Sequence, residues 1–442
     1  MPPLLIAFIV AATAWTALSL YLSARQTACV RHHRDEVPVD FAARVTLDEH
    51  RKAADYTVAR ERLARVHAVF DLAVSLAWVL GGINLLYGAL ASLLPPSLGL
   101  GVSFLVATFT VGALLKLPLD VYETFVLEQT FGFNRTTPLT FIADRLKGWA
   151  ITLAISVPLL FACLWAMRSF AGLWWLWTWF GLMAVMVAAP TVYVRLIAPR
   201  FNRFTPLGEG ELRARIERLM RRCGFRSSGL FSMDASRRSA HGNAYFIGFG
   251  NTKRVVLFDT LIAGSTPEEV EAVVAHELGH YRHGHVLFGL LRGALVTFVA
   301  LAAFGWLCKR AWLLPSFGIV HRDDALALLA CLLLNSMVGP LLAPLGNWIS
   351  RRNEFQADDY ARHHVAAAPM ISALLKLSRD NASTLTPDPL YALVHYSHPP
   401  VPIRIRHLHE AEKHGTVDVP AAAAAYPNEE VLAEGTGKHY IS

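Results

Sequence analysis

Two histidines and a glutamate lie close together in the sequence, in a pattern that can hold a metal ion. They are His276, Glu277 and His280, arranged as H-E-x-x-H. On a helix His276 and His280 are one turn apart on the same face, with Cβ atoms about 5–6 Å apart. Two neutral imidazoles at that separation can bind one tetrahedral zinc ion, and Glu277 lies beside them, outside the ligand row. The pattern therefore predicts the metal centre of a zinc hydrolase.

The surrounding segment has the features that place this pattern on a helix. Apolar residues recur at helical spacing, at Val270, Val273, Val274 and Leu278. Thr266 stands where an N-cap belongs, Pro267 takes the first helical position, and Glu269 follows three residues after the cap. A chance match among 18 histidines is the alternative. The agreement of the helix start, the apolar face and the position of the glutamate disfavours it.

A third zinc ligand must come from elsewhere in the chain. The longer metzincin pattern fails, because Gly284 and His285 each stand one place away from where that pattern needs them. The strongest candidate is Glu354, on a helix expected to continue from the last apolar stretch. Asp358 lies one turn further and can accept the free ring N–H of a zinc-bound histidine. The alternative for both acids is a solvated helix start, and His283 is a weaker ligand candidate because the helix would have to bend around the ion.

The composition is that of an integral membrane protein. Of 442 residues 54% are hydrophobic and 17% are charged, and the mean hydropathy is +0.37, whereas soluble domains average about 25% charged residues. Seven apolar stretches approach or exceed the ~20 residues that a bilayer requires. They are Pro3–Ser23, Val66–Leu94, Leu98–Leu117, Trp149–Met167, Ala171–Val194, Val286–Leu307 and Ala325–Ile349. The first lacks the basic start and cleavage site of a signal peptide, so we expect it to be an anchor.

The distribution of charge gives an orientation and excludes one class of partner. The net charge of +7 is not clustered with aromatic residues as on a nucleic-acid surface, so we interpret it as membrane-flanking charge and expect no nucleic-acid partner. Basic residues follow the first, third, fifth and last stretches, and none precedes the first. The N-terminus is therefore expected outside and the zinc site on the cytoplasmic side. Five cysteines without C-x-x-C spacing indicate neither a disulfide framework nor a thiolate metal site.

A soluble segment precedes the metal-binding helix. It contains an amphipathic helix at Glu209–Arg222 and three short strands, at Gly229–Ser232, Ala244–Ile247 and Arg254–Phe258. A small sheet there can offer an edge strand to an extended peptide. The fold class expected is all-α integral membrane, with about seven transmembrane helices and a small α+β zinc-protease domain. The expected divisions are 1–194 (five spans), 195–285 (sheet and metal-binding helix), 286–349 (two spans), 350–410 (the rest of the catalytic domain) and 411–442 (a mobile tail).

An ordered set of motifs along most of the chain resembles one known family. The blocks are Tyr122–Glu128 with Gly132–Asn134, Ile197–Leu207, Ser239–Phe246, Arg254–Leu261, the metal-binding helix, Asn353–Asp358 and His395–Pro400. Together they are far more specific than H-E-x-x-H alone. The chain resembles the integral-membrane zinc metalloproteases of the type I CAAX prenyl endopeptidase family.

The resemblance implies a fold, a site and a substrate class. It implies seven membrane helices enclosing a water-filled chamber, and one Zn²⁺ per chain held by His276, His280 and Glu354. Glu277 would be the general base and Asp358 would orient a ligand. His398 and Arg404 would stabilise the transition state, and Asn243, Ala244, Tyr245 and Phe246 would bind the substrate backbone. The implied partners are the lipid bilayer and a peptide or protein substrate, with removal of the C-terminal tripeptide from prenylated proteins as the family's reaction.

Two other functions remain open from the residues alone. A general quality-control protease of the membrane would use the same zinc chemistry, and a transporter or metal-binding membrane protein would also place polar residues in its spans. Ile403 stands where many relatives carry Glu, and the tail has no recognisable endoplasmic-reticulum retention signal. With the Arg- and Ala-heavy composition, these features favour a bacterial homologue in the inner membrane with its catalytic site facing the cytoplasm. A eukaryotic chain would instead lie in the endoplasmic-reticulum membrane.

Overall fold

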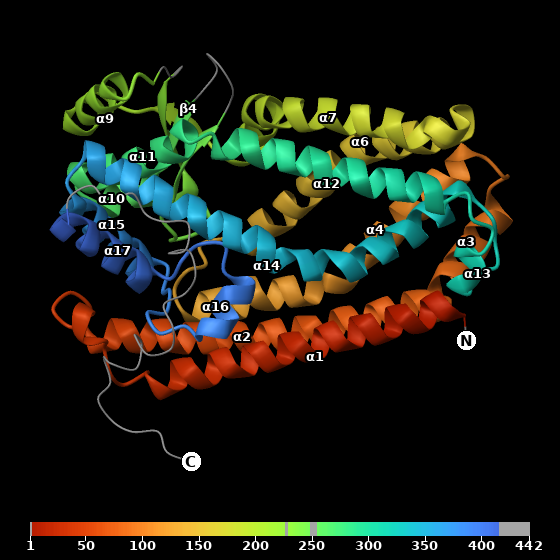
Figure 1. Cartoon of the computed structure of the whole chain (residues 1–442), viewed down its shortest axis with the longest axis horizontal. Coiled ribbons are helices and arrows are strands. Elements are labelled where there is room, and N and C mark those ends of the chain that lie inside the picture. The colour runs from red at the N-terminus through yellow and green to blue at the C-terminus, as the bar shows by residue number, and fades with distance from the viewer. Residues whose placement is uncertain (1, 226–228, 248–253, 415–442) are drawn as a thin grey trace. The chain divides into compact units, whose positions relative to one another are not determined.

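The computed structural model describes residues 2–225, 229–247 and 254–414 (Figure 1). The chain forms two compact units, each built from three separate stretches. The helical unit contains Met1–Tyr21, Leu63–Phe201 and Leu287–Leu341. The sheet unit contains Leu22–Arg62, Asn202–Val286 and Leu342–Ser442. The domain boundaries expected from the sequence stay a prediction.

Seven helical runs in the described part of the chain are long and apolar enough to cross a membrane, which confirms the number and the order expected. They are α1 (Pro3–His32), Leu47–Leu93, Leu98–Thr130, α6 (Pro138–Ser169), α7 (Trp174–Val192), α12 (His285–Leu307) and α14 (Asp324–His364). The second run comprises α2 (Leu47–Ala77), the π-helical turn η2 (Trp78–Gly82) and α3 (Ile83–Leu93). The third comprises α4 (Leu98–Tyr122), η3 (Glu123–Leu127) and α5 (Glu128–Thr130). Several runs continue as helix beyond their apolar stretches into polar sequence.

The helical unit has its own apolar core. Phe104 and Leu105 of α4 are fully buried in it, together with Phe317 and the first turns of α14. Large apolar side chains elsewhere in the unit, such as Phe288 and Leu295 of α12, are exposed in the absence of lipid. That pattern fits helices that face hydrocarbon. The remaining short elements are η4 (Ala171–Leu173), η5 (Tyr193–Ile197), α8 (Ala198–Phe201) and α13 (Leu313–Ser316).

The sheet unit contains a four-stranded mixed sheet in the order β1-β2-β4-β3. The strands are β1 (Phe204–Pro206), β2 (Leu230–Met233), β3 (Ala244–Ile247) and β4 (Arg254–Phe258). β2 and β4 are parallel, and the two outer pairs are antiparallel. β4 is central and carries the buried residues Val255, Val256 and Leu257, so the sheet is covered on both faces.

The sheet unit also contains helices and short helical turns. They are η1 (Val39–Phe41), α9 (Glu211–Arg222), η6 (Ala235–Arg237), α10 (Asp259–Gly264), α11 (Pro267–Arg282), α15 (Ala367–Asp380), α16 (Pro389–His395) and α17 (Val401–His414). α11 packs against α9, α15 and β3. Its buried residues Val270, Val274 and Leu278 join the core around β4. The helix that carries the metal-binding pattern is thus fixed on several sides.

The start of α11 is set by the residues that the sequence indicated. Thr266 is the N-cap, and its hydroxyl and the Glu269 carboxylate form a reciprocal capping box. Glu269 is buried and also accepts hydrogen bonds from Ser372 (2.6 Å) and Lys376 (2.7 Å) of α15. Burial alone would raise the pKa of Glu269, but Lys376 and Ser372 outweigh it and the pKa is lowered. The Glu269 carboxylate is therefore charged, and it links the N-terminal cap of α11 to α15.

Replacing Glu269 tests this link. Glu269→Gln removes the charge that pairs with Lys376, so we expect a loss of about 1–3 kcal/mol of stability and a lower unfolding midpoint in detergent. Glu209→Gln is the matched control, because the Glu209 side chain is 87% exposed and pairs only with Arg213 at the surface. Equal unfolding midpoints for the two variants would contradict the role given to Glu269.

Candidate metal centre

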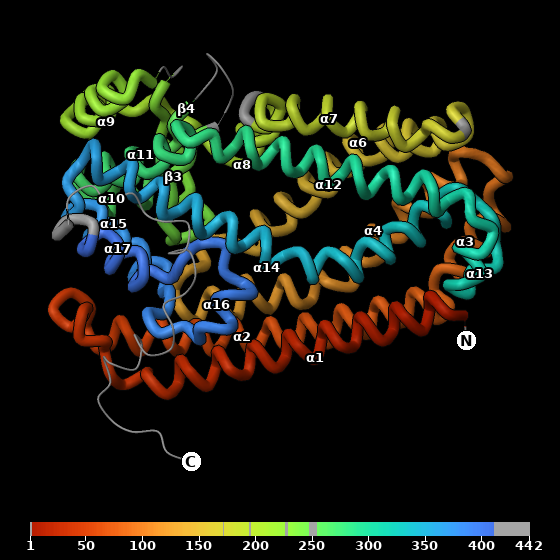
Figure 2. Tube along the Cα trace, viewed as in Figure 1, coloured from red at the N-terminus to blue at the C-terminus, as the bar shows by residue number. Residues whose placement is uncertain are grey.

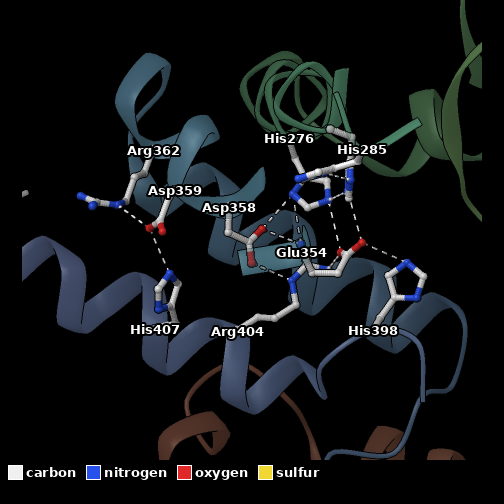
Figure 3. Close-up of polar contacts among 10 residues, drawn as sticks. His276, His285, Glu354, Asp358, Asp359, Arg362, His398, Arg404 and His407 are labelled. Carbon is white, nitrogen blue, oxygen red and sulfur yellow. Dashed lines mark hydrogen bonds and ion pairs between the residues drawn. The ribbon is translucent and has the colours of Figure 1, made fainter. Parts of the chain in front are cut away.

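Three side chains from two helices of the sheet unit form a group that can bind a metal. His276 and His280 come from α11 and Glu354 from α14, and their ligand atoms all lie within 4.8 Å of one another. The two imidazole Nε2 atoms are 3.2 Å apart. Glu354 Oε2 lies 3.4 Å from His276 Nε2, and its Oε1 lies 3.2 Å from His280 Nε2 (Figure 3).

The spacing of these atoms fits zinc. Tetrahedral zinc with bonds of about 2.0–2.1 Å sets its ligand atoms about 3.3–3.4 Å apart. The two imidazole Nε2 atoms are 3.2 Å apart, and each of them has a different Glu354 oxygen 3.2–3.4 Å away, which is close to that value. Glu354 Oε2 is also buried and makes no hydrogen bond with any described residue. Two imidazoles and a carboxylate are a donor set that zinc prefers, so the residues present fit the ion.

Asp358 fixes the ring of the first histidine. Its Oδ1 lies 2.9 Å from His276 Nδ1, and the carboxylate is fully buried. We assign the proton to Nδ1, which donates to Asp358 and leaves Nε2 free for the metal. Burial lowers the pKa of His276, but the carboxylates of Asp358 and Glu354 outweigh it and raise the value to about 9. The two carboxylates therefore favour a positive charge on or beside the His276 ring. A metal ion at His276 Nε2 competes with a proton at the same nitrogen.

The second histidine has a different partner, which the sequence did not point to. His280 Nδ1 lies 3.0 Å from His285 Nδ1, and His285 Nε2 lies 2.9 Å from Gln356 Oε1. A chain in which His280 donates to His285 and His285 donates to Gln356 satisfies every nitrogen and leaves His280 Nε2 for the metal. The clue in the sequence was a further histidine five residues after His280. His283, the weaker ligand candidate, lies outside the ligand group.

Arg404 of α17 is a buried guanidinium beside the ligands. Its Nε donates to Asp358 Oδ2 (2.8 Å) and its Nη2 to Asp358 Oδ1 (2.6 Å). Its Nη1 lies 3.3 Å from Glu354 Oε2. Charged, bidentate contacts of this kind are strong and directional. They favour a role for Arg404 in positioning Asp358 and Glu354, and the transition-state role expected from the sequence stays a prediction.

Glu277, the general base expected from the sequence, adjoins the first histidine ligand. It follows His276 on α11 and is half-buried. Burial raises the pKa of its carboxyl group, and the charges of the neighbouring histidines and Arg404 oppose that rise. A carboxylate with a raised pKa is a stronger base than one at the usual value, which suits the role expected for Glu277 from the sequence.

His398 is exposed next to the ligand group. Its Nε2 lies 3.3 Å from Glu354 Oε1, and its Nδ1 lies 3.0 Å from Ser397 Oγ. Helix α16 precedes His398 in the chain, and side-chain hydrogen bonds hold this helix at both of its ends. Asp388, the N-cap of α16, accepts hydrogen bonds from Arg25 and donates its N–H to Gln26. At the other end Arg351, one turn before Glu354 on α14, donates to the carbonyls of Leu393 and Tyr396.

Gly279 lets the two ligand-bearing helices approach closely. A Cβ at this position would lie 2.9 Å from the Cα and 3.0 Å from the carbonyl oxygen of Ala357 on α14. Such backbone contacts cannot be relieved by rotating a side chain. Ala357 is fully buried one turn beyond Glu354, so the contact sets the distance between the histidines and the glutamate. Sequence reasoning missed this residue, because its role is in packing.

The strand expected to bind substrate lies at the edge of the sheet. Among the described residues β3 pairs only with β4, and it also contacts α11 (Figure 2). The Phe258 N–H donates to the Asn243 carbonyl. By the alternation of antiparallel pairs, the backbone groups of Ala244 and Phe246 therefore point away from β4. The Ala244 N–H is held by the side-chain oxygen of Asn243 at 2.8 Å.

Comparison with known proteins identifies the family. Residues 26–203 match the family model described as CAAX prenyl protease N-terminal, five membrane helices, and residues 206–412 match peptidase family M48. A CAAX prenyl protease 1 homolog of Arabidopsis thaliana is 32% identical over 405 residues, which cover 89% of this chain and 94% of the relative. The chain belongs to the CAAX prenyl protease 1 family.

Further members of the family support this assignment. CAAX prenyl protease 1 of Saccharomyces cerevisiae is 35% identical over 320 residues, covering 68% of this chain and 70% of the relative. The crystal structure of S. mikatae Ste24p matches with a TM-score of 0.86 at 30% identity, covering 92% of this chain and 99% of that one. The chain is thus a multi-pass membrane metalloendopeptidase of family M48 with a zinc site. The transporter interpretation is thereby set aside.

Substitution of Gly279 tests the helix contact. In Gly279→Ala the added methyl group must push α11 away from α14, so we expect zinc affinity to fall at least about tenfold and stability by about 1–3 kcal/mol. Competition with a chromophoric chelator measures the affinity. Gly346→Ala on α14 is the matched control, because a Cβ there meets no atom within 4 Å. Unchanged zinc affinity in Gly279→Ala would show that the close approach is not needed.

Proposed function

We propose that this protein is a zinc endopeptidase that cleaves near the C-terminus of prenylated proteins. The observation that carries the proposal is the His–His–Glu group in a chain whose relatives, named CAAX prenyl proteases, match it over most of its length. Cleavage of a peptide chain is the reaction that the site suits. The prenylated substrate comes from the names of the relatives.

The residues around the ligand group divide the chemistry among them. His276, His280 and Glu354 would hold Zn²⁺, which would act as a Lewis acid and lower the pKa of bound water to about 7. Glu277 accepts the proton from the attacking water and passes it to the leaving amine. Asp358 holds His276 in the tautomer that binds through Nε2.

His398 and Arg404 have different roles in this proposal. His398 is exposed and points its Nε2 towards the ligand group, so it donates a hydrogen bond to the developing oxyanion, a contribution of about 3–4 kcal/mol in other hydrolases. Each of the three guanidinium nitrogens of Arg404 contacts Asp358 or Glu354. Arg404 therefore positions these carboxylates, and its Nη1, which does not contact Asp358, is the nitrogen from which it would also donate to the oxyanion.

The substrate backbone lies along Asn243–Phe246. In the part of the chain that the structure describes, no strand pairs with the outer edge of β3, and this supports the placement, because an added strand binds through main-chain groups and tolerates varied side chains. A peptide that pairs with β3 must displace the Asn243 side chain from the Ala244 N–H. The distribution of basic residues supports a cytoplasmic location of the site. The sequence features noted above favour a bacterial inner membrane, with the endoplasmic-reticulum membrane as the eukaryotic alternative.

Substitution of the proposed base tests the mechanism. Glu277→Gln keeps the size of the side chain but removes the proton acceptor, so we expect kcat to fall by at least about 100-fold while zinc stays near one per chain. Cleavage of an internally quenched peptide and metal analysis of the same sample provide the measurements. Glu217→Gln, at a surface ion pair on α9, is the control. Retained cleavage by Glu277→Gln would remove Glu277 from the mechanism.

The prenyl group is tested separately from the peptidase chemistry. We expect a farnesylated C-terminal peptide to be cleaved with kcat/KM at least about tenfold above the same peptide without the lipid, since buried CH₂ groups add about 0.8 kcal/mol each. Chelation should stop both reactions and added zinc restore them. Equal cleavage of the two peptides would instead favour the alternative, a quality-control protease. Trapping of substrates by the inactive Glu277→Gln variant would then identify them.

A further inference from the structure

A charged cavity lies in the helical unit, within that unit alone. Its volume is about 870 Å³, within the range of small-molecule sites. Its lining residues come from the end of α6, the segment that follows α12 and the start of α14. Six of its lining residues are charged: Arg168, Lys309, Arg310, Arg322, Asp323 and Asp324. None of them belongs to the metal centre.

The two acidic residues in the cavity already have partners. Arg168 lies 3.6 Å from Asp323 and 3.3 Å from Asp324. Asp323 Oδ1 also accepts the N–H of Ala325 at 2.8 Å, at the first turn of α14. Both carboxylates are therefore occupied by the protein itself.

The other three cations in the cavity have no such partner. Within the described ranges, no carboxylate lies within 4.0 Å of the charged nitrogens of Lys309, Arg310 or Arg322. The lining as a whole has four positive and two negative side chains, and Arg168 offsets part of the negative charge. The remaining excess is positive, so the ligand that complements it is an anion.

The cavity lies at the level where a membrane helix meets the headgroups. α6 and α12 end here and α14 begins here, and all three are candidate membrane spans. Trp306 and Trp312, on either side of Lys309 and Arg310, are exposed, as tryptophans are in the interfacial belt of membrane proteins. The Arg310 guanidinium lies 4.3 Å from the centre of the Trp306 ring, which holds this cation at the same level.

We propose that this cavity binds the phosphate group of an anionic membrane lipid. Lys309, Arg310 and Arg322 contact the phosphate, and the apolar surface beside Trp306 and Trp312 contacts the acyl chains. Cationic side chains close to a membrane surface attract anionic groups through charge. A free phosphate ion would satisfy the three cations but not the exposed apolar rim, and this difference separates the two sources experimentally.

The test uses the full-length zinc protein, stripped of lipid in a neutral detergent. Native mass spectrometry counts bound lipid as phosphatidylglycerol or phosphatidylcholine is added. We expect one phosphatidylglycerol to bind with at least about tenfold preference over phosphatidylcholine. The variant Lys309→Gln/Arg310→Gln/Arg322→Gln should lose this preference. The control Arg44→Gln/Arg218→Gln/Arg237→Gln removes three exposed cations of the sheet unit and should keep it.

Several results would overturn the assignment. These are equal binding of the two lipids by the unaltered protein, or a preference that survives in the cavity variant. Displacement of the bound phosphatidylglycerol by millimolar inorganic phosphate would assign the cavity to a small soluble anion instead. Zinc content and the unfolding midpoint in neutral detergent confirm that the variant is folded. Should it not fold, the single variant Arg322→Gln must lower the preference several-fold for the proposal to stand.

Discussion

The structure around the metal centre depends on a buried set of charges that balance only when a cation is present. Glu354 and Asp358 are both buried, and one guanidinium, that of Arg404, contacts both of them. Two carboxylates and one arginine leave a net negative charge in an environment where an uncompensated charge is costly. With Glu277 also ionised, a divalent ion between neutral imidazoles would bring the sum of these charges to zero. The ion is therefore a structural partner of α11, α14 and α17 as well as the source of the chemistry.

Local sequence was sufficient to predict those features that depend on local geometry. The capping box at Thr266 and the spacing of His276 and His280 follow from the pitch of one helix, and the structure has both. Glu354 could be proposed because its helix continues from an apolar stretch, and α14 is a single helix from Asp324 to His364 (Figure 2). The strand positions were predicted to within a residue, apart from β1. That strand has three residues and ends in a proline, so it carries no alternating pattern.

Contacts between distant segments could not be read from the sequence. Gly279 in a helix has no signal of its own, and only the position of Ala357 shows why a methyl group is excluded there. The His285–Gln356 pair and the support of α16 by Arg25 and Arg351 join residues that lie far apart in the chain. The family resemblance supplied the roles of His398 and Arg404. It did not indicate that Arg404 directs its donors at Asp358.

Within the described ranges the outer edge of β3 carries no partner strand, and this has a consequence for association with other chains. A strand that recognises backbone rather than side chains would accept almost any extended chain, including an unfolding neighbour, and exposed strand edges are common starting points for aggregation. The amide of Asn243 covers the N–H of Ala244, the first outward-facing donor of the strand. A chain that touches this edge by accident must therefore replace a hydrogen bond that already exists. The Asn243 side chain thus covers a donor with which another extended chain would otherwise pair.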